Sequence, residues 1–306
     1  MLSRPRVSVH VVLACAALAI LLPGRAAAQQ QFVRGQNVQP AYEGWERNPD
    51  GTYSLYFGYL NRNVEEMPDI PIGPNNTFSP GPADRGQPTH FYPRRQTILF
   101  KVQVPSDWSE KQELVWTVTH NGRTDRAVGW LAPFYEFDTT VLRAQRSGSQ
   151  RMSTPEELQA KPPTIERDGP AALTTPVNAP LSLSVLVRDD GFPGPARRRM
   201  MPAGSESTDA GLRPLSRTSF PDTDMVRAAN ASRTGLAVTW LHYRGPGAVT
   251  FDPMTVPLDK TGGKATTSVR FSAPGEYVIR AMADDQIFTA PLNVTVTVTP
   301  AVTSQR

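Results

Sequence analysis

The sequence predicts an all-β fold, with two β-sandwich domains joined by an irregular connector. Short runs of apolar residues alternate with polar residues at a period of two, which is the pattern of strands that bury one face. The 30 prolines and 22 glycines among the 306 residues indicate many turns between short elements. Together these two observations favour sandwiches over a helical architecture.

Residues 1–28 have the features of a secretory signal peptide. Two arginines precede an apolar run over residues 7–22, and Ala26-Ala27-Ala28 offers a cleavage site after Ala28. The apolar run falls short of the ~20 residues that span a bilayer. We therefore expect an extracytoplasmic protein, located in the periplasm, on the cell surface or in the medium.

The chain has one cysteine, Cys15, in the segment Val12-Leu13-Ala14-Cys15, which resembles a bacterial lipobox. A lipid anchor at Cys15, or a retained signal segment, would give the protein a membrane association. Otherwise Cys15 leaves with the signal, and the mature chain has no disulfide, thiolate nucleophile or cysteine-ligated metal.

Charge argues against nucleic acid as a partner. The net charge of +4 comes from 32 basic and 28 acidic residues, and three of the arginines leave with the signal. The mature chain is therefore close to neutral, without a field that would attract nucleic acid or an anionic membrane.

The first domain is expected over residues 41–140, after a flexible leader at 29–40. Alternating runs predict strands at 52–60, 98–104 and 114–118, and Asn121-Gly122 has the residues of a type I′ hairpin turn that returns through 127–131. Residues 61–95 are rich in Pro, Gly and Asn and are expected to form a long loop without regular elements.

The connector is expected at 141–175, with a short helix where Thr154-Pro155-Glu156-Glu157 has capping residues. The second domain follows at 176–300. Its alternating runs predict strands at 181–187, 236–240, 248–251, 265–271, 277–283 and 294–298. A long insertion at 192–234 contains Arg197-Arg198-Arg199, which we interpret as a solvated loop.

The second domain resembles bacterial PKD-like (polycystic kidney disease) and related immunoglobulin-like repeats. The resemblance covers residues 162–299. It rests on Val238-Thr-Trp240, Gly245-Pro-Gly-Ala-Val-Thr-Phe251, Phe271-Ser-Ala-Pro-Gly-Glu-Tyr277-Val-Ile-Arg-Ala281 and Ala283-Asp284. It implies an immunoglobulin-like sandwich in extracytoplasmic proteins, with Trp240 buried between the sheets and Tyr277 as a tyrosine corner. The insertion at 192–234 departs from the usual loop length.

Two acidic turns are the candidate metal site. The strands that end at Arg188 and Ala283 are expected to run toward the same end of the sandwich, which would gather Asp189, Asp190, Asp284 and Asp285. Calcium binds such converging carboxylates. The alternative is that these residues are ordinary turn chemistry. No other cofactor is expected.

Aromatic residues of the first domain are the candidate binding surface. Four of them lie in or beside expected loops, or on the parity opposite the apolar face: Trp45, Tyr56, Tyr92 and Trp108. Exposed rings bind sugars or protein partners. The alternative is that the rings cover a core under the 61–95 loop.

The sequence has no recognisable catalytic motif. The three histidines of the mature chain, His90, His120 and His242, are far apart in sequence, and we do not expect them to form a metal site. The first hypothesis is an exported non-enzymatic protein that acts in binding, adhesion or cell-envelope structure, with a protein or polysaccharide partner. The alternatives are a carbohydrate-binding accessory module and a secreted hydrolase.

Overall fold

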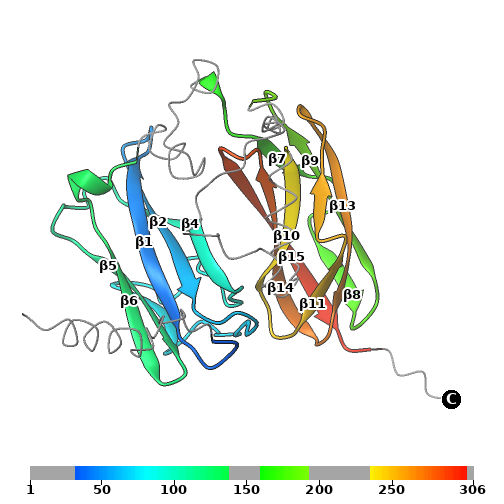
Figure 1. Cartoon of the computed structure of the whole chain (residues 1–306), viewed down its shortest axis with the longest axis horizontal. Coiled ribbons are helices and arrows are strands. Elements are labelled where there is room, and N and C mark those ends of the chain that lie inside the picture. Colours follow the sequence, from blue (N-terminus) through cyan, green and yellow to red (C-terminus); the bar gives the residue numbers. More distant parts are fainter. Residues whose placement is uncertain (1–31, 138–158, 193–234, 302–306) are drawn as a thin grey trace, which may run out of the picture. The chain divides into compact units, whose positions relative to one another are not determined.

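The computed structural model describes residues 32–137, 159–192 and 235–301, and these residues form two β-sandwiches of immunoglobulin-like architecture (Figure 1). This confirms the predicted fold class. The signal peptide, Cys15, the short helix expected at 154–157 and Arg197–Arg199 lie outside the described residues. Within the described residues, no helix has the length and apolar content needed to span a membrane.

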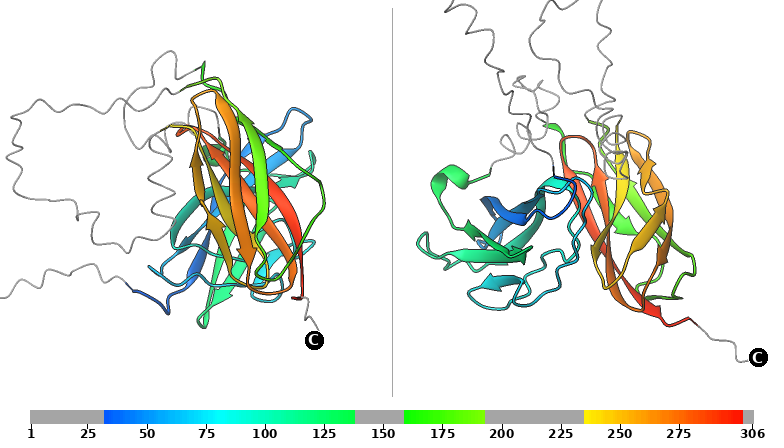
Figure 2. Two further views of the ribbon diagram at one scale, coloured as in Figure 1. Left: turned by 90° about the vertical axis from the view of Figure 1, so that its right-hand side faces the viewer. Right: turned by 60° about the horizontal axis from the view of Figure 1, so that its bottom comes forward.

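The first sandwich has two three-stranded sheets, with strand orders β1-β2-β4 and β3-β5-β6. Its strands are β1 (Val38–Arg47), β2 (Tyr53–Asn61), β3 (Asn76–Ser79), β4 (Arg94–Val104), β5 (Leu114–His120) and β6 (Arg123–Gly129). Figure 2 gives two further views of these layers. The strands expected at 52–60, 98–104 and 114–118 are thus confirmed as β2, β4 and β5.

Aromatic side chains fill the core of this sandwich. Phe57 of β2 stacks on Phe100 of β4 and meets the indole of Trp116 edge-on, with ring centroids 5.7 Å and 6.3 Å away. Phe57 and Trp116 are buried at 0 % exposure. Asn121 and Gly122 take φ values of 49° and 71°, which confirms the predicted type I′ turn between β5 and β6.

Two expectations for this domain are wrong. Val38–Pro40, expected in the flexible leader, lie in β1, where Val38 is fully buried. The 61–95 segment, expected to lack regular elements, contains β3, which pairs with β5 so that Phe78 lies opposite Trp116. Composition alone was misleading here, because buried side-chain amides hold this polar segment in place, as described below.

The second sandwich packs a five-stranded sheet, β12-β10-β14-β15-β8, on a four-stranded sheet, β11-β13-β9-β7. Its strands are β7 (Thr164–Arg167), β8 (Leu173–Pro176), β9 (Leu181–Arg188), β10 (Ala237–Arg244), β11 (Val249–Asp252), β12 (Thr255–Pro257), β13 (Gly262–Phe271), β14 (Gly275–Asp284) and β15 (Thr289–Thr299). All six predicted strands are present. The strands β7 and β8 were assigned to the connector, which therefore ends earlier than expected.

Both predicted core aromatics of this domain lie where the resemblance implied. Trp240 and Tyr277 are buried at 0 % exposure, and the Tyr277 hydroxyl donates a hydrogen bond of 2.8 Å to the Ala273 carbonyl oxygen. Tyr277 is therefore a tyrosine corner. Gly245 makes this packing possible, because a Cβ at that position would lie 2.1 Å from Cδ1 of Tyr277.

Candidate functional site

The end of β10, at Tyr243 and Arg244, contacts the first sandwich. Tyr243 belongs to β10, yet its ring lies in the core cluster of the first sandwich, and its hydroxyl donates to the Gly86 carbonyl oxygen at 2.6 Å. The backbone N–H of Thr89 donates to the Tyr243 carbonyl oxygen at 3.0 Å. Residues 84–92 of the first sandwich are therefore hydrogen-bonded to β10 of the second. We call this contact between residues 84–92 and β10 the junction.

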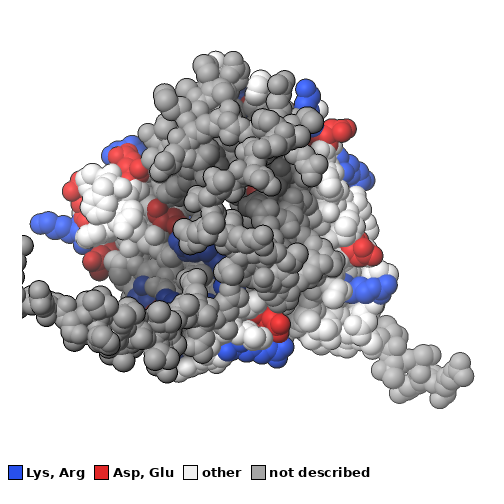
Figure 3. Space-filling model, viewed as in Figure 1, with Lys and Arg blue, Asp and Glu red and all other residues white. Residues whose placement is uncertain are grey.

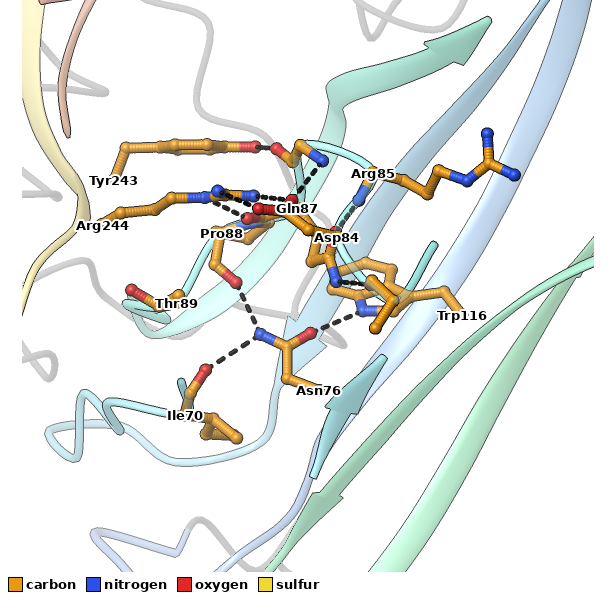
Figure 4. A network of polar contacts seen from close by, with 12 residues as sticks. Ile70, Asn76, Asp84, Arg85, Gln87, Pro88, Thr89, Trp116, Tyr243 and Arg244 are labelled. Carbon is orange, nitrogen blue, oxygen red and sulfur yellow. Dashed lines mark hydrogen bonds and ion pairs between the residues drawn. The ribbon is translucent and has the colours of Figure 1, made fainter. Parts of the chain in front are cut away.

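Arg244 adds a charged contact to the junction (Figure 4). Its Nη1 and Nη2 lie 2.9 Å and 2.7 Å from the two carboxylate oxygens of Asp84, and its Nε donates to the Gln87 carbonyl oxygen at 2.7 Å. The hydrogen bonds from Arg244 lower the pKa of Asp84, against a smaller effect of burial. A bidentate arginine–carboxylate pair fixes the relative orientation of the two side chains as well as their distance.

Buried amides organise the first-sandwich side of the junction. The Asn76 side chain is fully buried, and its Nδ2 donates to the carbonyl oxygens of Ile70 and Pro88 at 2.9 Å and 2.8 Å, while its Oδ1 accepts from the Trp116 indole at 2.9 Å (Figure 4). Gln87 is also fully buried and bonds to the backbone of Ala83 and Arg85. These amides take the place of strand partners in a segment without regular pairing.

The amide-held segment places an aspartate beside a histidine. The Ile70 N–H donates to the Thr89 carbonyl oxygen at 2.7 Å, and Asp69 and His90 form an isolated antiparallel bridge. Nδ1 of His90 lies 2.7 Å from Oδ1 of Asp69. The ring of His90 stacks on His242 of β10, with centroids 4.4 Å apart and planes inclined by 27°.

We call Asp69, His90 and His242 the histidine cluster. One prospective ligand atom from each residue lies within 4.8 Å of the other two. Within the described ranges, it is the one group of three or more His, Cys, Asp or Glu side chains that meets this distance. The expectation that the histidines stay dispersed is wrong for His90 and His242. His120 lies apart, with its Nε2 3.1 Å from Oε1 of Glu66.

His242 is the buried member of the cluster, with 2 % exposure. Its backbone N–H donates to the Tyr92 hydroxyl at 2.9 Å, but neither ring nitrogen has a hydrogen-bond partner. The pKa of His242 is lowered to about 3, chiefly by burial and also by the neighbouring His90, against smaller opposing effects of Asp69 and the Arg244 backbone. The imidazole is therefore neutral, the form that can offer a lone pair.

The four predicted calcium ligands act as turn caps. One carboxylate oxygen of each accepts a hydrogen bond from a backbone N–H two residues farther along the chain. These pairs are Asp189 with Gly191, Asp190 with Phe192, Asp284 with Gln286 and Asp285 with Ile287. Among the described residues, these four aspartates do not form a group of three or more prospective metal ligands within 4.8 Å of one another. This is the turn chemistry of the alternative interpretation.

Asp285 is unusual among these caps. It is 2 % exposed, and its Oδ2 has no hydrogen-bond partner. The pKa of Asp285 is raised to about 7, chiefly by burial and also by the charges of Asp189 and Asp284, against the hydrogen bonds from Phe288 and Ile287. The two acidic turns are thus close enough to interact electrostatically.

The four aromatic residues predicted as a binding surface are not fully exposed to solvent. Trp45 and Tyr92 are buried, at 6 % and 9 % exposure, which makes the expectation of exposed rings wrong for both. Tyr56 is half-buried, and its hydroxyl donates to Glu46. Trp108 is half-buried against the core of the first sandwich. The rings are covered because Trp45, near the end of β1, lies against Ala132, to which its indole donates, and Tyr92 lies in the junction.

Other rings of the first sandwich are exposed. Trp130, Phe134 and Tyr135, which we call the aromatic segment, are 37 %, 77 % and 39 % exposed. Phe134 and Tyr135 belong to a short 3₁₀ helix, Pro133–Tyr135, and their ring centroids are 4.7 Å apart. One sequence signal could have found this segment. It is an aromatic run at the end of the last strand predicted for the first domain, without the alternation of apolar and polar residues that marks a strand.

β1 holds the aromatic segment in place. The Trp45 indole donates to the Ala132 carbonyl oxygen at 2.8 Å, and the Tyr42 hydroxyl donates to the Trp130 carbonyl oxygen at 2.6 Å. The Phe137 N–H donates to the Trp45 carbonyl oxygen at 2.6 Å. Trp45 therefore positions the exposed rings instead of binding a ligand with its own.

Both signs of charge occur on the face shown in Figure 3, where basic and acidic side chains are interspersed along the uncovered edge. Such a surface is typical of a protein without long-range attraction for one kind of polyion.

In sequence, the chain matches no protein-family model and no curated protein. In structure, it is similar to domains 4 and 5 of the S-layer protein SbsC, with 10 % identity and a TM-score of 0.25, over 61 % of this chain and 65 % of that one. The N-terminal eight immunoglobulin domains of the Down syndrome cell adhesion molecule match with 7 % identity and a TM-score of 0.22, over 86 % of this chain and 27 % of that one.

The fibronectin(III)-like modules of CbhA from Clostridium thermocellum match with 11 % identity and a TM-score of 0.23, over 88 % of this chain and 98 % of that one. The chain spans less than two thirds of the S-layer and cell-adhesion structures. At these identities the similarity concerns the fold alone.

Proposed function

We propose that this chain is an exported, non-enzymatic protein that binds a partner at the cell envelope through its immunoglobulin-like sandwiches. Export is supported by the signal-peptide features of residues 1–28. The PKD-like character of the second sandwich is supported by the Val238-Thr-Trp240 and Phe271–Ala281 strings. Repeats of this type imply adhesive or spacing roles outside the cytoplasm.

The aromatic segment is the observation that carries the proposal. Phe134 has 77 % of its surface in water, and Trp130 and Tyr135 lie close to it in the chain. Exposed aromatic side chains near one another are costly in water and are typical of binding surfaces. Because Trp45 and Tyr42 hold this segment on a strand, the rings lose little conformational freedom when a partner binds.

The polar groups of the junction support a structural role over a catalytic one. The side chains of Asn76, Gln87 and Arg244 all bond to backbone carbonyl groups of the first sandwich. Groups that are used in this way fix loops and are not free to act on a substrate. We therefore assign the junction to architecture and the aromatic segment to binding.

Binding to isolated cell envelopes tests this proposal. The labelled mature chain is titrated onto envelope fractions of the source cells, beside the variant Trp130→Ser/Phe134→Ser/Tyr135→Ser. A matched control replaces three exposed apolar residues elsewhere, Met67, Leu186 and Phe192, with serine. We expect saturable binding for the wild type and the control, with at least a tenfold weaker Kd for the aromatic variant. Equal binding by all three proteins would refute the proposal.

A carbohydrate-binding accessory module is the second candidate. It is favoured by the neighbouring rings of Phe134 and Tyr135, since sugar faces stack on exposed aromatic rings. Retention on peptidoglycan, cellulose and chitin, with the same two triple variants, distinguishes it from protein binding. Retention that requires the aromatic segment supports this candidate, whereas envelope binding without polysaccharide retention supports a protein partner.

A further inference from the structure

We infer that the histidine cluster is a binding site for one divalent cation of the zinc class. Its residues come from both sandwiches, Asp69 and His90 from the first and His242 from the second. The inference is independent of the binding function proposed above, because the histidine cluster and the aromatic segment share no residue.

The ligand chemistry favours zinc over calcium or magnesium. Two imidazoles and one carboxylate form the three-ligand set that zinc accepts, with a water molecule as the fourth ligand. Calcium and magnesium require more oxygen ligands than Asp69 can provide. Nickel and copper share the preference for imidazole, so the site is defined by its ligands and not by one metal.

The burial of His242 points to a ligand. Both of its ring nitrogens are buried without a hydrogen-bond partner. A polar atom buried in this way is unfavourable unless something satisfies it. A metal bound at one ring nitrogen would provide a partner for that atom. His90 and Asp69 are the side chains placed to complete the coordination, since one ligand atom from each of the three residues lies within 4.8 Å of the other two.

Solvent can reach the site from the Asp69 side. The side chain of Asp69 is 44 % exposed and that of His90 is 11 % exposed, whereas His242 lies beneath them. An ion can therefore enter past Asp69 and keep a water ligand on that side. Once bound, it would tie the 68–91 segment of the first sandwich to β10 of the second, so it would stabilise the junction in addition to the Arg244–Asp84 pair.

The test uses the mature chain without a polyhistidine tag, stripped with a chelator and titrated with Zn²⁺ in competition with a chromophoric chelator. Binding is followed by that competition, by the metal content after dialysis, and by the melting temperature. We expect one Zn²⁺ per chain with a micromolar or lower Kd, and a melting temperature that rises with zinc concentration.

Three variants decide the assignment. His242→Phe removes both nitrogens and keeps a ring of similar shape, so zinc binding should be lost. Asp69→Asn changes an exposed side chain and should weaken zinc binding at least tenfold. His120→Ala is the matched control, since His120 also pairs with a carboxylate, that of Glu66, but lies outside the cluster. It should leave zinc binding unchanged.

Near-ultraviolet circular dichroism checks that each variant folds. If His242→Phe is unfolded, Asp69→Asn alone decides. The inference is overturned if the wild type binds no zinc above the level of a folded His242→Phe, or if Asp69→Asn binds zinc as tightly as the wild type. It is also overturned if His120→Ala loses zinc to the same extent as the cluster variants.

Discussion

The guanidinium carbon of Arg280 lies 3.5 Å from the centroid of the Tyr243 ring. The two residues come from neighbouring strands of the second sandwich, β14 and β10, and Arg280 also donates from Nη1 to the Leu99 carbonyl oxygen of the first sandwich at 2.6 Å. A cation stacked on a buried ring and bonded across the junction links the two cores. Burial lowers the pKa of Arg280, but an arginine remains charged.

Truncation of Tyr243 should weaken both sandwiches together. Tyr243→Ala removes a ring that is 3 % exposed, at a cost of about 3–5 kcal/mol, as for other core aromatics. Tyr243→Phe removes only the hydrogen bond to Gly86 and should cost about 1 kcal/mol. Urea unfolding followed by tryptophan fluorescence measures both variants. A Tyr243→Ala protein as stable as the Tyr243→Phe protein would show that the ring does not support the junction.

Removal of the Asn76 side chain should loosen the segment that carries His90. Asn76→Ala leaves the Trp116 indole and two backbone carbonyl groups without partners, so we expect a loss of about 3 kcal/mol in the free energy of unfolding. Hydrogen exchange should also become faster for the Thr89 and Phe91 amides, whose acceptors are Tyr243 and Pro68. Unchanged protection of these amides would contradict the role given to Asn76.

Gly245 should tolerate no side chain. A Cβ there would lie 2.1 Å from the Tyr277 ring, and overpacking of this kind costs about 1–3 kcal/mol in addition to backbone strain. Gly169 is a matched control: it too precedes a proline and has a φ of 145°, against 152° at Gly245, but it has nothing within 4 Å of the added atom. Thermal unfolding should therefore show Gly245→Ala to be clearly less stable than Gly169→Ala. Equal losses would mean that the close approach to Tyr277 has no energetic weight.

Asp285 should make stability depend on pH. Its folded-state pKa of about 7 lies above the ordinary aspartate value of 3.8, so between these values the folded protein holds a proton that the unfolded chain has lost. Stability from this group is complete below pH 4 and is lost as the pH rises toward 7. Asp285→Asn keeps an oxygen for the Ile287 and Phe288 amides and needs no proton. It should gain on the order of 2 kcal/mol over the wild type at pH 8.

The measurement is the melting temperature of the two proteins between pH 4 and pH 8. The difference between the two melting temperatures should grow with pH and level off above about pH 7, which is the folded-state pKa of Asp285. A difference that stays constant or shrinks as the pH rises would show that the folded-state pKa of Asp285 is not raised.

Local patterns predicted most of the strands, because alternation and turn chemistry act over a few residues. Leu55, Phe57 and Tyr59 share one parity and are all buried, and Asn121-Gly122 makes the turn that its residue types favour. Trp240 and Tyr277 followed from the family resemblance. What alternation could not show is which face of β10 meets another domain.

The sites depended on contacts between distant residues, which no local pattern reports. His242 approaches His90 where the proline-rich segment, held by Asn76 and Gln87, bonds to β10 through Thr89 and Tyr243. Trp45 was interpreted as a binding residue because it is aromatic and lies beside an expected loop, yet it is covered by the segment that its indole holds. In both cases the residue that mattered was placed by a hydrogen bond to a residue far away in the sequence, from the His242 backbone to Tyr92 and from the Trp45 indole to Ala132.

The most direct test of the account is whether the two sandwiches move as one body. Spin labels at Arg126→Cys in the first sandwich and Ser182→Cys in the second, both exposed positions, report their separation in a protein with Cys15 replaced by serine. Pulsed electron-spin distance measurements should give one narrow distribution for the wild-type junction and a broad one for Tyr243→Ala. A broad distribution in the wild-type junction would contradict the claim that Tyr243, Arg244 and Arg280 hold the sandwiches together.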